Sequence, residues 1–444
     1  MKSRLFGLFL LLTLVISALS AVFPSEGVNA ESIPDVFVGV DIAYGDVDEV
    51  CSYTNLFVLG CTGVTQNKLK LEEACQYLFD KGLFFVVYQE YPIDFGWLSV
   101  AKSDWLENAK TRWGNQFLGI YYTDEVGGRQ LDHVSHWMTV EKADSYADAN
   151  SQFNTGVGES VNWFRNGYSG GNNICLFTSD YGLYWFDYQA GYNVILAQFG
   201  WNYSRQLNIG LCRGAATALD KEWGAMITWT YKQPPYIESG AELYNDLLLA
   251  YDNGAKYIMV FNSNEEYLGG ILEQEHLDAL KQFWQYSQQN SRKAISVNDR
   301  GAYVLPEDYA YGFRGPNDKI WGLWEADALS TPISIQVGSI LEQYPSELDI
   351  VYEDAIGLGG TQEYNSFFYW NSSPTEPGRP SPTPRNGASS ETPLDWFSYL
   401  DLPIVLMFAV ATLTVTVGSI VFVRRTRSRQ SSFSSYESKL INNI

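Results

Sequence analysis

The sequence predicts an α/β fold in which a (β/α)8 barrel, the TIM-barrel architecture, precedes a small α/β domain. Three observations predict the barrel. Apolar runs of strand composition alternate with amphipathic helical stretches between residues 36 and 290. Runs such as FFVVY and YIMVF are apolar at every position, as in parallel strands covered by helices. The segment 41–48 (DIAYGDVD) lacks the G-x-G-x-x-G loop expected for the competing fold, an open doubly wound sheet.

Each barrel element has its own local signal. The helix expected at 69–81 (LKLEEACQYLFDK) is amphipathic, and Gly82 follows it as a C-cap. Further helices are expected at 105–113, 141–164, 205–219, 241–253 and 273–289. The eight strands are expected at 36–42, 55–60, 83–89, 117–122, 174–178, 194–199, 225–231 and 257–261.

We place the barrel at residues 31–293. A smaller unit follows it and occupies residues 294–371. Strands are expected at 302–305 and 348–352, a helix at 335–343 and a further strand at 367–370. Its aromatic segment 317–324 (NDKIWGLW) either reaches over a barrel face or simply packs against the barrel, and we favour packing.

The N-terminal 30 residues have the pattern of a secretory signal peptide. Two basic residues in MKSR precede an apolar run over 5–21, and Val28-Asn29-Ala30 offers a small-residue cleavage site. An uncleaved anchor helix is the alternative.

The C-terminal region predicts a membrane anchor. Residues 372–401 form a stalk rich in Pro, Ser and Thr. The 22 residues 402–423 are apolar apart from Thr412, Thr414, Thr416 and Ser419, enough to cross a hydrocarbon core of about 30 Å. Four arginines follow, at 424, 425, 427 and 429, which places the tail 424–444 in the cytoplasm. We therefore expect a single-pass protein of the cell membrane with the bulk of its chain extracellular.

Composition excludes several classes of function. A formal net charge of −22 disfavours nucleic acid as a partner. The three histidines lie away from the strand ends, at His133, His136 and His276, so Ser-His-Asp, Cys-His and His-rich zinc chemistry lose support. We expect no cofactor and no metal. A weaker alternative is an oxygen-ligand site for calcium or magnesium formed by Asp41, Asp124 and Asp180.

The carboxyl ends of the expected strands carry acids and aromatic residues, and barrel active sites lie at this end. Glycoside hydrolysis needs two carboxyl groups, and aromatic faces stack on sugar rings. The candidate catalytic residues are Glu125, Asp124, Asp41, Asp180 and Glu90. The candidate sugar-binding residues are Tyr44, Tyr91, Tyr122, Tyr181, Trp201, Trp229, Tyr231 and Asn262.

The pair Asp124-Glu125 is the most specific catalytic candidate of this set. Adjacent residues at a strand end point in different directions, so one should face the pocket while the other caps a loop or helix. We favour Glu125 as proton donor, with Asp124 as the alternate; an N-cap and a solvated carboxylate would be the purely structural interpretation. Asp41 could instead bond to the barrel rim. Arg205 and Arg213 lie on one helix and are expected to pair with carboxylates rather than bind substrate.

Four segments, YYTDEVGG, FTSDYGLYWFDY, AQFGWNYSRQLNIGLCRGAA and MITWTYKQPPY, carry a resemblance that covers roughly residues 35–370. The chain resembles glycoside-hydrolase-like (β/α)8 barrels, and more closely a set of exported, membrane-anchored archaeal proteins of that type. In the large retaining clan of such barrels the acid/base Glu follows strand four and the nucleophile Glu follows strand seven. The resemblance therefore implies Glu125 as acid/base. The segment 229–233 (WTYKQ) after strand seven has no carboxylate, which leaves open an inverting mechanism, a nucleophile from another strand, or loss of catalysis. The unit 294–371 resembles the small α/β domain that follows some β-galactosidase-like barrels.

Two functions remain in view from the sequence. The first is a cell-surface glycoside hydrolase that acts on an extracellular or envelope glycan by carboxylate acid/base catalysis. The alternative is a non-catalytic glycan-binding or envelope-organising protein on a degenerate glycosidase barrel.

Overall fold

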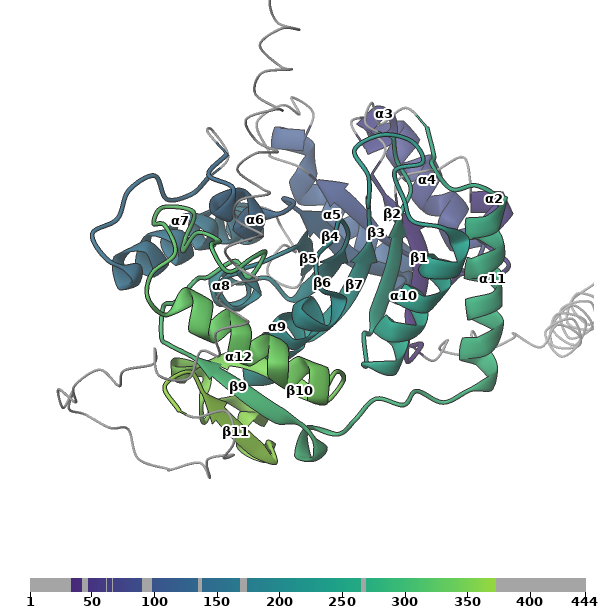
Figure 1. Ribbon diagram of the computed structural model, residues 1–444. Helices are drawn as coiled ribbons and strands as arrows, with labels where there is room; N and C mark the ends of the chain where they lie inside the picture. The colour runs from purple at the N-terminus through teal and green to yellow at the C-terminus, as the bar shows by residue number, and fades with distance from the viewer. Residues whose placement is uncertain are drawn as a thin grey trace, which may run out of the picture. The chain divides into compact units, whose positions relative to one another are not determined.

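The computed structural model describes residues 33–41, 47–60, 62–65, 67–89, 98–134, 138–167, 174–264 and 269–372 (Figure 1). The signal peptide, most of the stalk, the membrane span and the tail, all predicted from sequence, lie outside these ranges. Within them, no helix combines the length and apolar character needed to cross a bilayer.

Eight parallel strands close into a barrel in sequence order, as predicted. β1 pairs with β2 on one side and with β8 on the other, which closes the ring. The strands are β1 (Phe37–Asp41), β2 (Leu56–Leu59), β3 (Phe84–Gln89), β4 (Phe117–Tyr122), β5 (Cys175–Asp180), β6 (Val194–Phe199), β7 (Glu222–Ile227) and β8 (Tyr257–Phe261).

The seventh strand starts and ends earlier than the predicted 225–231. Its ladder with β6 runs from Glu222 to Ile227. The chain then turns back on itself, since the backbone N–H groups of Thr230 and Tyr231 both donate to the Tyr236 carbonyl. Trp229 therefore belongs to the loop after β7 rather than to the strand.

Helices surround the barrel (Figure 1). α4 begins where the Asn67 side chain accepts from the Lys70 N–H, and Gly82, with φ +74°, follows its last turn, as expected of a C-cap position. The short helices α6 and α8 have no counterpart in the sequence prediction. In the part of the chain that the structure describes, the helices are α2 (Val47–Val50), α3 (Thr62–Thr65), α4 (Lys68–Asp80), α5 (Leu98–Trp113), α6 (Val126–Leu131), α7 (Tyr146–Gly167), α8 (Tyr184–Ala190), α9 (Arg205–Ala218), α10 (Gly240–Asp252), α11 (Gln274–Gln289) and α12 (Ser330–Gln343).

The apolar core has two parts, because side chains alternate between the two faces of each strand. Every second residue points into the barrel, as Phe37, Phe84, Tyr121, Phe177 and Tyr257 do. The residues between them point outward into a larger core shared with the helices. This alternation decides which residues at the strand ends can reach a pocket in the barrel mouth.

A three-stranded parallel sheet follows the barrel, in the order β10 (Leu348–Tyr352), β9 (Gly301–Leu305), β11 (Ser366–Tyr369). β10 packs directly on α9. A Cβ on Gly214 would lie only 2.4 Å from the Ile350 carbonyl oxygen, so glycine permits this close approach.

A buried ion cluster joins the sheet to the barrel. Asp349 on β10 accepts from Arg213 Nε on α9 and from Arg300 Nη1, both at 2.6 Å, and from the Tyr364 hydroxyl at 2.7 Å. Asp349 has no exposed surface. Arg213 thus pairs with a carboxylate, as the sequence analysis expected.

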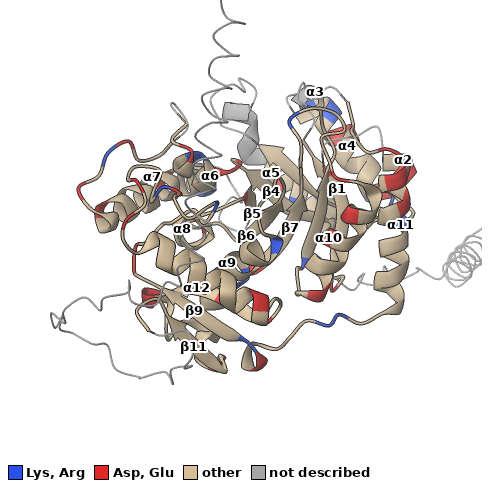
Figure 2. Cartoon of the chain, viewed as in Figure 1, with Lys and Arg blue, Asp and Glu red and all other residues tan. Residues whose placement is uncertain are grey.

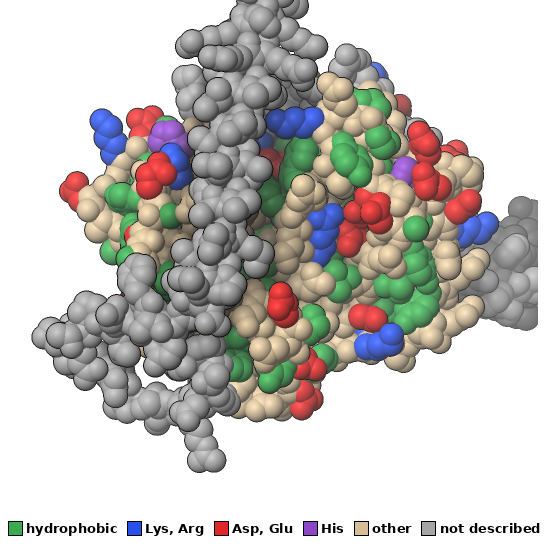
Figure 3. All heavy atoms as spheres, in the orientation of Figure 1, with side chains coloured by type: hydrophobic (Ala, Val, Ile, Leu, Met, Phe, Trp, Pro, Cys, Tyr) green, Lys and Arg blue, Asp and Glu red, His purple; other side chains and the backbone are tan. Residues whose placement is uncertain are grey.

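Acidic side chains outnumber basic ones across the visible elements (Figure 2), in keeping with the net charge of −22. On the face drawn in Figure 3 they are dispersed between basic, polar and apolar side chains. Among the described residues on this face, no broad basic area of the kind that polyanions need is seen.

Candidate active site

A pocket of about 820 Å³ lies at the carboxyl ends of the barrel strands. Its floor consists of inward-facing residues from around the barrel, namely Asp41, Gly60, Tyr88, Tyr121, Ser179, Gln198, Met226, Thr228 and Phe261. Its walls come from the loops that follow, namely Asp124, Glu125, Arg129, Asp132, Tyr181, Trp201, Asn202, Tyr203, Trp229 and Lys232. The pocket therefore combines carboxyl groups with aromatic faces.

The structure brings six of the predicted site residues together in this pocket: Glu125, Asp124, Asp41, Tyr181, Trp201 and Trp229. Three others, Glu90, Tyr44 and Tyr91, lie outside the described residues. The remaining four, Asp180, Tyr122, Tyr231 and Asn262, are described but do not line the pocket.

Asp124 and Glu125 both line the pocket, although we expected only one of them to face it. The backbone turns sharply here, because Thr123 and Glu125 adopt φ values of 54° and 53°, in the left-handed region. Non-glycine residues rarely adopt this conformation, and such strain is concentrated at functional sites. Glu125 holds the N-cap position of α6 without a side-chain cap bond, so its carboxyl group is available to the pocket.

Hydrogen bonds hold the two carboxyl groups. The Tyr121 hydroxyl donates to Asp124 Oδ1 at 2.5 Å, and Ser179 Oγ donates to the same oxygen at 2.9 Å. Gln198 Nε2 donates to Glu125 Oε1 at 2.7 Å and to Ser179 Oγ at 2.8 Å. One network from β4, β5 and β6 therefore positions both acids.

The surroundings of Glu125 favour the protonated form of its carboxyl group. Burial and the negative charge of Asp124 raise the pKa of Glu125 to about 8, against the lowering effect of the Gln198 hydrogen bond. Each of these causes acts on the charged form of the carboxyl group. Glu125 is consequently protonated at neutral pH, while it faces a pocket with other carboxyl groups.

Asp180 has a structural task instead. It points outward from β5 and is fully buried. Its Oδ2 accepts from the Gly127 N–H at 2.7 Å, and its Oδ1 accepts from the N–H groups of Gly128, Tyr181 and Gly182 at 2.7 to 3.1 Å. Asp180 thereby anchors the start of α6, directly after Glu125. Because its oxygens face these amides and not the pocket, Asp41, Asp124 and Asp180 do not converge on one cation.

Asp187 on α8 is a second fully buried acid, next to Asp180. Burial, together with the charge of Asp180, raises the pKa of Asp187 well above its usual range, which favours the protonated form in the folded state. The unfolded chain releases that proton above a pH of about 4. At neutral pH the unfolded chain therefore ionises Asp187 more readily than the folded chain does. This difference lowers the stability of the folded protein.

Asp187→Asn is expected to stabilise the protein at pH 7, because an amide needs no proton to remain neutral. The gain reflects the free energy lost when the chain folds around a carboxyl group whose pKa is raised above its ordinary value. It should shrink as the pH falls towards 4, where Asp187 is protonated in both states. Urea unfolding at pH 7 and pH 4 measures this. A variant equally stabilised at both pH values, or destabilised at pH 7, would contradict the assignment.

Strand alternation explains why Tyr122 and Asn262 lie elsewhere, and the early end of β7 explains the position of Tyr231. Tyr122 follows the inward-facing Tyr121, so its ring points outward, packs on Phe164 and bonds through its hydroxyl to Ser160. Asn262 follows the inward-facing Phe261, and its Oδ1 accepts from the N–H groups of Ile271 and Leu272. Tyr231 lies on the loop after β7 and is 48% exposed.

The aromatic walls are held in place by their own contacts. Tyr181 stacks on Tyr203 with ring centroids 6.0 Å apart, and Trp229 Nε1 donates to the Ser263 carbonyl at 2.9 Å. Arg205 fixes the loop after β6: its Nη1 donates to three backbone carbonyls, including those of Trp201 and Tyr203. Arg205 also pairs with two carboxylates, those of Glu238 and Asp246.

Sequence reasoning did not select several pocket residues as catalytic or sugar-binding candidates, although Tyr121, Ser179 and Gln198 stood at the ends of predicted strands. Tyr88, Tyr121, Ser179 and Gln198 occupy inward-facing positions at the ends of four strands, and counting in steps of two along each strand would have found them. Tyr203, Arg129 and Asp132 lie on loops or a short helix, where no periodicity identifies them.

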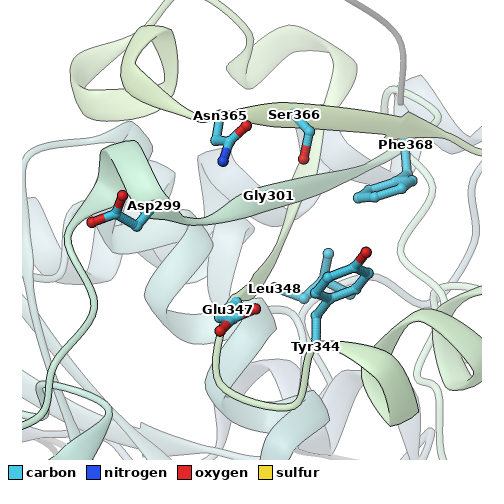
Figure 4. Close-up of a pocket in the computed structure, with 8 residues that line it drawn as sticks. All are labelled: Asp299, Gly301, Tyr344, Glu347, Leu348, Asn365, Ser366 and Phe368. Atoms are coloured by element: carbon cyan, nitrogen blue, oxygen red, sulfur yellow. The ribbon is translucent and has the colours of Figure 1, made fainter. Parts of the chain in front are cut away.

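A second pocket, of about 260 Å³, lies on the C-terminal sheet (Figure 4). The rings of Tyr344 and Phe368 lie toward one end, and the carboxylates of Asp299 and Glu347 toward the other. This pocket is smaller than the one in the barrel mouth, and it lacks a hydrogen-bond network like the one that holds both Asp124 and Glu125. We therefore take the barrel pocket as the candidate active site.

No family model matches the chain, and no curated protein matches it in sequence. Solved structures with similar folds include a spore coat polysaccharide biosynthesis protein from Bacillus subtilis (11% identity, 60% of this chain, 72% of that chain, TM-score 0.31). Another is a trimodular GH5_4 subfamily endoglucanase (10% identity, 64% of each chain, TM-score 0.34). A third is a beta-glycosidase (9% identity, 57% of this chain, 87% of that chain, TM-score 0.35). The match thus spans less than two thirds of the endoglucanase. These likenesses concern the barrel fold and carry no information about activity.

Proposed function

We propose that the protein is a glycoside hydrolase that acts on an extracellular or envelope glycan. The observation that carries the proposal is the placement of Glu125 beside Asp124 in a pocket walled by Trp201, Trp229 and Tyr203. A protonated carboxyl group can donate to the glycosidic oxygen as the bond to the anomeric carbon breaks. The aromatic side chains would stack on the sugar rings next to that bond.

A second carboxyl group completes the proposed chemistry. Asp124 lies next to Glu125 in the chain, on the same side of the pocket, and two hydroxyl groups hold its Oδ1. Asp41 points inward from the end of β1, which is separated from β4 by two strands around the ring. We infer that Asp41 acts as the base: it takes one proton from a water molecule, whose oxygen bonds to the anomeric carbon while Glu125 protonates the departing oxygen. This assignment favours an inverting reaction.

The proposed location follows from the predicted signal peptide and C-terminal span, which would hold the barrel outside the cell. Labelling intact cells with a membrane-impermeant reagent tests this point separately from activity. Labelled barrel residues are the expected result, and labelling only after lysis would contradict the location.

The test of function is a screen of the full-length protein in detergent against 4-nitrophenyl glycosides and a glycan array. Release of nitrophenol from at least one glycoside, with binding of related glycans on the array, is expected. Binding without turnover would favour the second candidate, a non-catalytic glycan-binding protein. Its specific support is the end of β7, where Thr228 and Trp229 line the pocket and no carboxylate does. The absence of both binding and turnover would contradict both functions.

The pH dependence of hydrolysis should follow the titration of Glu125. Since the proton donor must be protonated, kcat/KM is expected to fall about tenfold per pH unit above a pH of about 8. Asp124→Asn removes the neighbouring charge that raises the pKa of Glu125, so the decline should begin at lower pH. Tyr122→Phe, which changes an outward-facing hydroxyl, serves as the control and should leave the profile unchanged. A decline that does not move in Asp124→Asn would argue against this assignment.

A further inference from the structure

Arg314, in the segment between β9 and α12, is the centre of a polar cluster that reaches the barrel pocket. Its guanidinium forms a two-pronged pair with Asp318, from Nε to Oδ2 and from Nη2 to Oδ1, both at 2.9 Å. Its Nη1 bonds to Asp132 Oδ1, on the barrel. The side chain of Arg314 is 18% exposed. The cluster therefore links the C-terminal domain to a carboxylate that lines the pocket.

Asp132 and the two stacked tyrosines connect Arg314 with the pocket wall. The Tyr181 hydroxyl donates to Asp132 Oδ2 at 2.6 Å, so Asp132 joins Tyr181 to Arg314. The Tyr203 hydroxyl lies beside the Arg314 guanidinium, which counteracts the rise that burial causes in the pKa of Tyr203. The rings of Tyr181 and Tyr203 are nearly parallel, with an interplanar angle of 27°. Asp132, Tyr181 and Tyr203 all line the pocket.

The segment that carries Arg314 is fastened to α6, the helix that begins directly after Glu125. Gln130 on α6 is fully buried, and its Nε2 donates to the Trp321 carbonyl at 2.9 Å. A Cβ on Gly322 would lie 2.0 Å from the Gln130 carbonyl oxygen, so only glycine fits here. Trp321 packs its ring on Phe186 with centroids 4.6 Å apart. This buried contact holds the segment with Arg314 against the barrel. In Figure 1 the green loops of this part of the chain approach α6 and α7.

We propose that Arg314 is a positioning residue for substrate binding, by which the C-terminal domain holds the stacked pair Tyr181–Tyr203 as one wall of the pocket. The inference rests on the proposed function for its readout in catalysis, but the geometry itself is independent of it. An arginine fork that pairs with two carboxylates fixes orientation in a way that a lysine point charge does not. In this assignment the wall binds the sugar, whereas Glu125, held by Gln198, performs the chemistry.

The first experiment needs no substrate. 3-Fluorotyrosine is incorporated at position 203 of the full-length protein, and its 19F resonance is followed in the parent chain, Arg314→Ala, Arg314→Lys and Lys319→Ala. Lys319 pairs with Glu325 on the same segment, at the surface, and is the matched control. Arg314→Ala is expected to shift or broaden the resonance, Arg314→Lys to restore it in part, and Lys319→Ala to leave it unchanged. An identical resonance in the parent chain and in Arg314→Ala would overturn the inference, whatever the enzyme does.

The second experiment uses the 4-nitrophenyl glycoside that the screen identifies. Arg314→Ala is expected to raise KM about tenfold or more with kcat changed less than twofold, because the wall binds the sugar in the ground state and transition state alike. Arg314→Lys should recover part of that loss. An equal loss of kcat in Arg314→Ala, with KM unchanged, would place Arg314 in the chemistry and contradict the positioning role. If no glycoside is turned over, the proposed function fails, and the fluorine measurement still decides the inference.

Discussion

Glu125→Gln is expected to reduce kcat about 100- to 10,000-fold while sugar binding survives, because the amide retains the shape of the side chain but has no acidic proton to donate. Glutamine can still bond to Gln198, so the network that holds Asp124 and Ser179 should persist. Hydrolysis of a 4-nitrophenyl glycoside measures the loss, and a glycan array or calorimetric titration measures the binding that remains. Nitrophenol is a good leaving group that needs little protonation, so a natural glycan should show the larger loss.

The matched control is Glu159→Gln, which makes the same chemical change at an exposed position on α7. This variant should retain full activity. Full activity in Glu125→Gln would remove Glu125 from the mechanism and leave the pocket as a binding site. Loss of binding together with activity, with unfolding at lower urea concentration, would instead show that Glu125 supports the structure of the loop.

Asp349→Ala is expected to cost about 3–5 kcal/mol of the free energy of unfolding. Asp349 is the shared partner of two buried guanidinium groups, and its removal leaves both charges enclosed without the carboxylate that balances them. Arg213 belongs to the barrel and Asp349 to the C-terminal sheet. The loss of the Asp349 carboxylate should therefore also weaken the contact between the barrel and this sheet. Urea unfolding followed by tryptophan fluorescence measures the stability.

Asp278→Ala on the exposed face of α11 is the comparison for this stability measurement, and it should change the free energy of unfolding by less than about 0.5 kcal/mol. A second variant, Asp349→Asn, retains the shape and some hydrogen bonds but not the charge, and we expect a loss close to that of Asp349→Ala. Equal stability of Asp349→Ala and the parent chain would show that the two arginines find other partners, and the buried-charge interpretation would be wrong.

The two predictions act on different links between residue and function. Glu125 sits where a strained turn exposes its carboxyl group to the pocket, so its replacement alters chemistry with little effect on the fold. Asp349 does not line the pocket, so its replacement alters the stability of the fold first. Measuring activity and stability for both variants therefore separates the site from its scaffold.

The barrel itself was predictable from local patterns. Strand composition and helix amphipathicity reside in contiguous residues, and the number and order of β1–β8 followed from them directly. The acidic pair Asp124–Glu125 was recognisable as well, because it directly follows β4. Even the inward set Asp41, Tyr88, Tyr121, Ser179 and Gln198 is implicit in the alternation of side chains along a strand, although the prediction did not apply that rule and so included Tyr122, Asp180 and Asn262.

Other features depend on residues that are distant in the chain and become neighbours only when the barrel closes. The pairing of Gln198 with Glu125, the bonds from the Gly127 and Gly128 amides to Asp180 and the contact between Arg314 and Asp132 join segments separated by dozens to nearly two hundred residues. The turn at Thr123–Glu125 is likewise set by its surroundings, because the local preference of non-glycine residues opposes a positive φ. Local chemistry thus determined which secondary structures form and which residue types lie near the rim. Closure of the barrel, and the packing of the C-terminal sheet on α9, decided which of those side chains meet in the pocket.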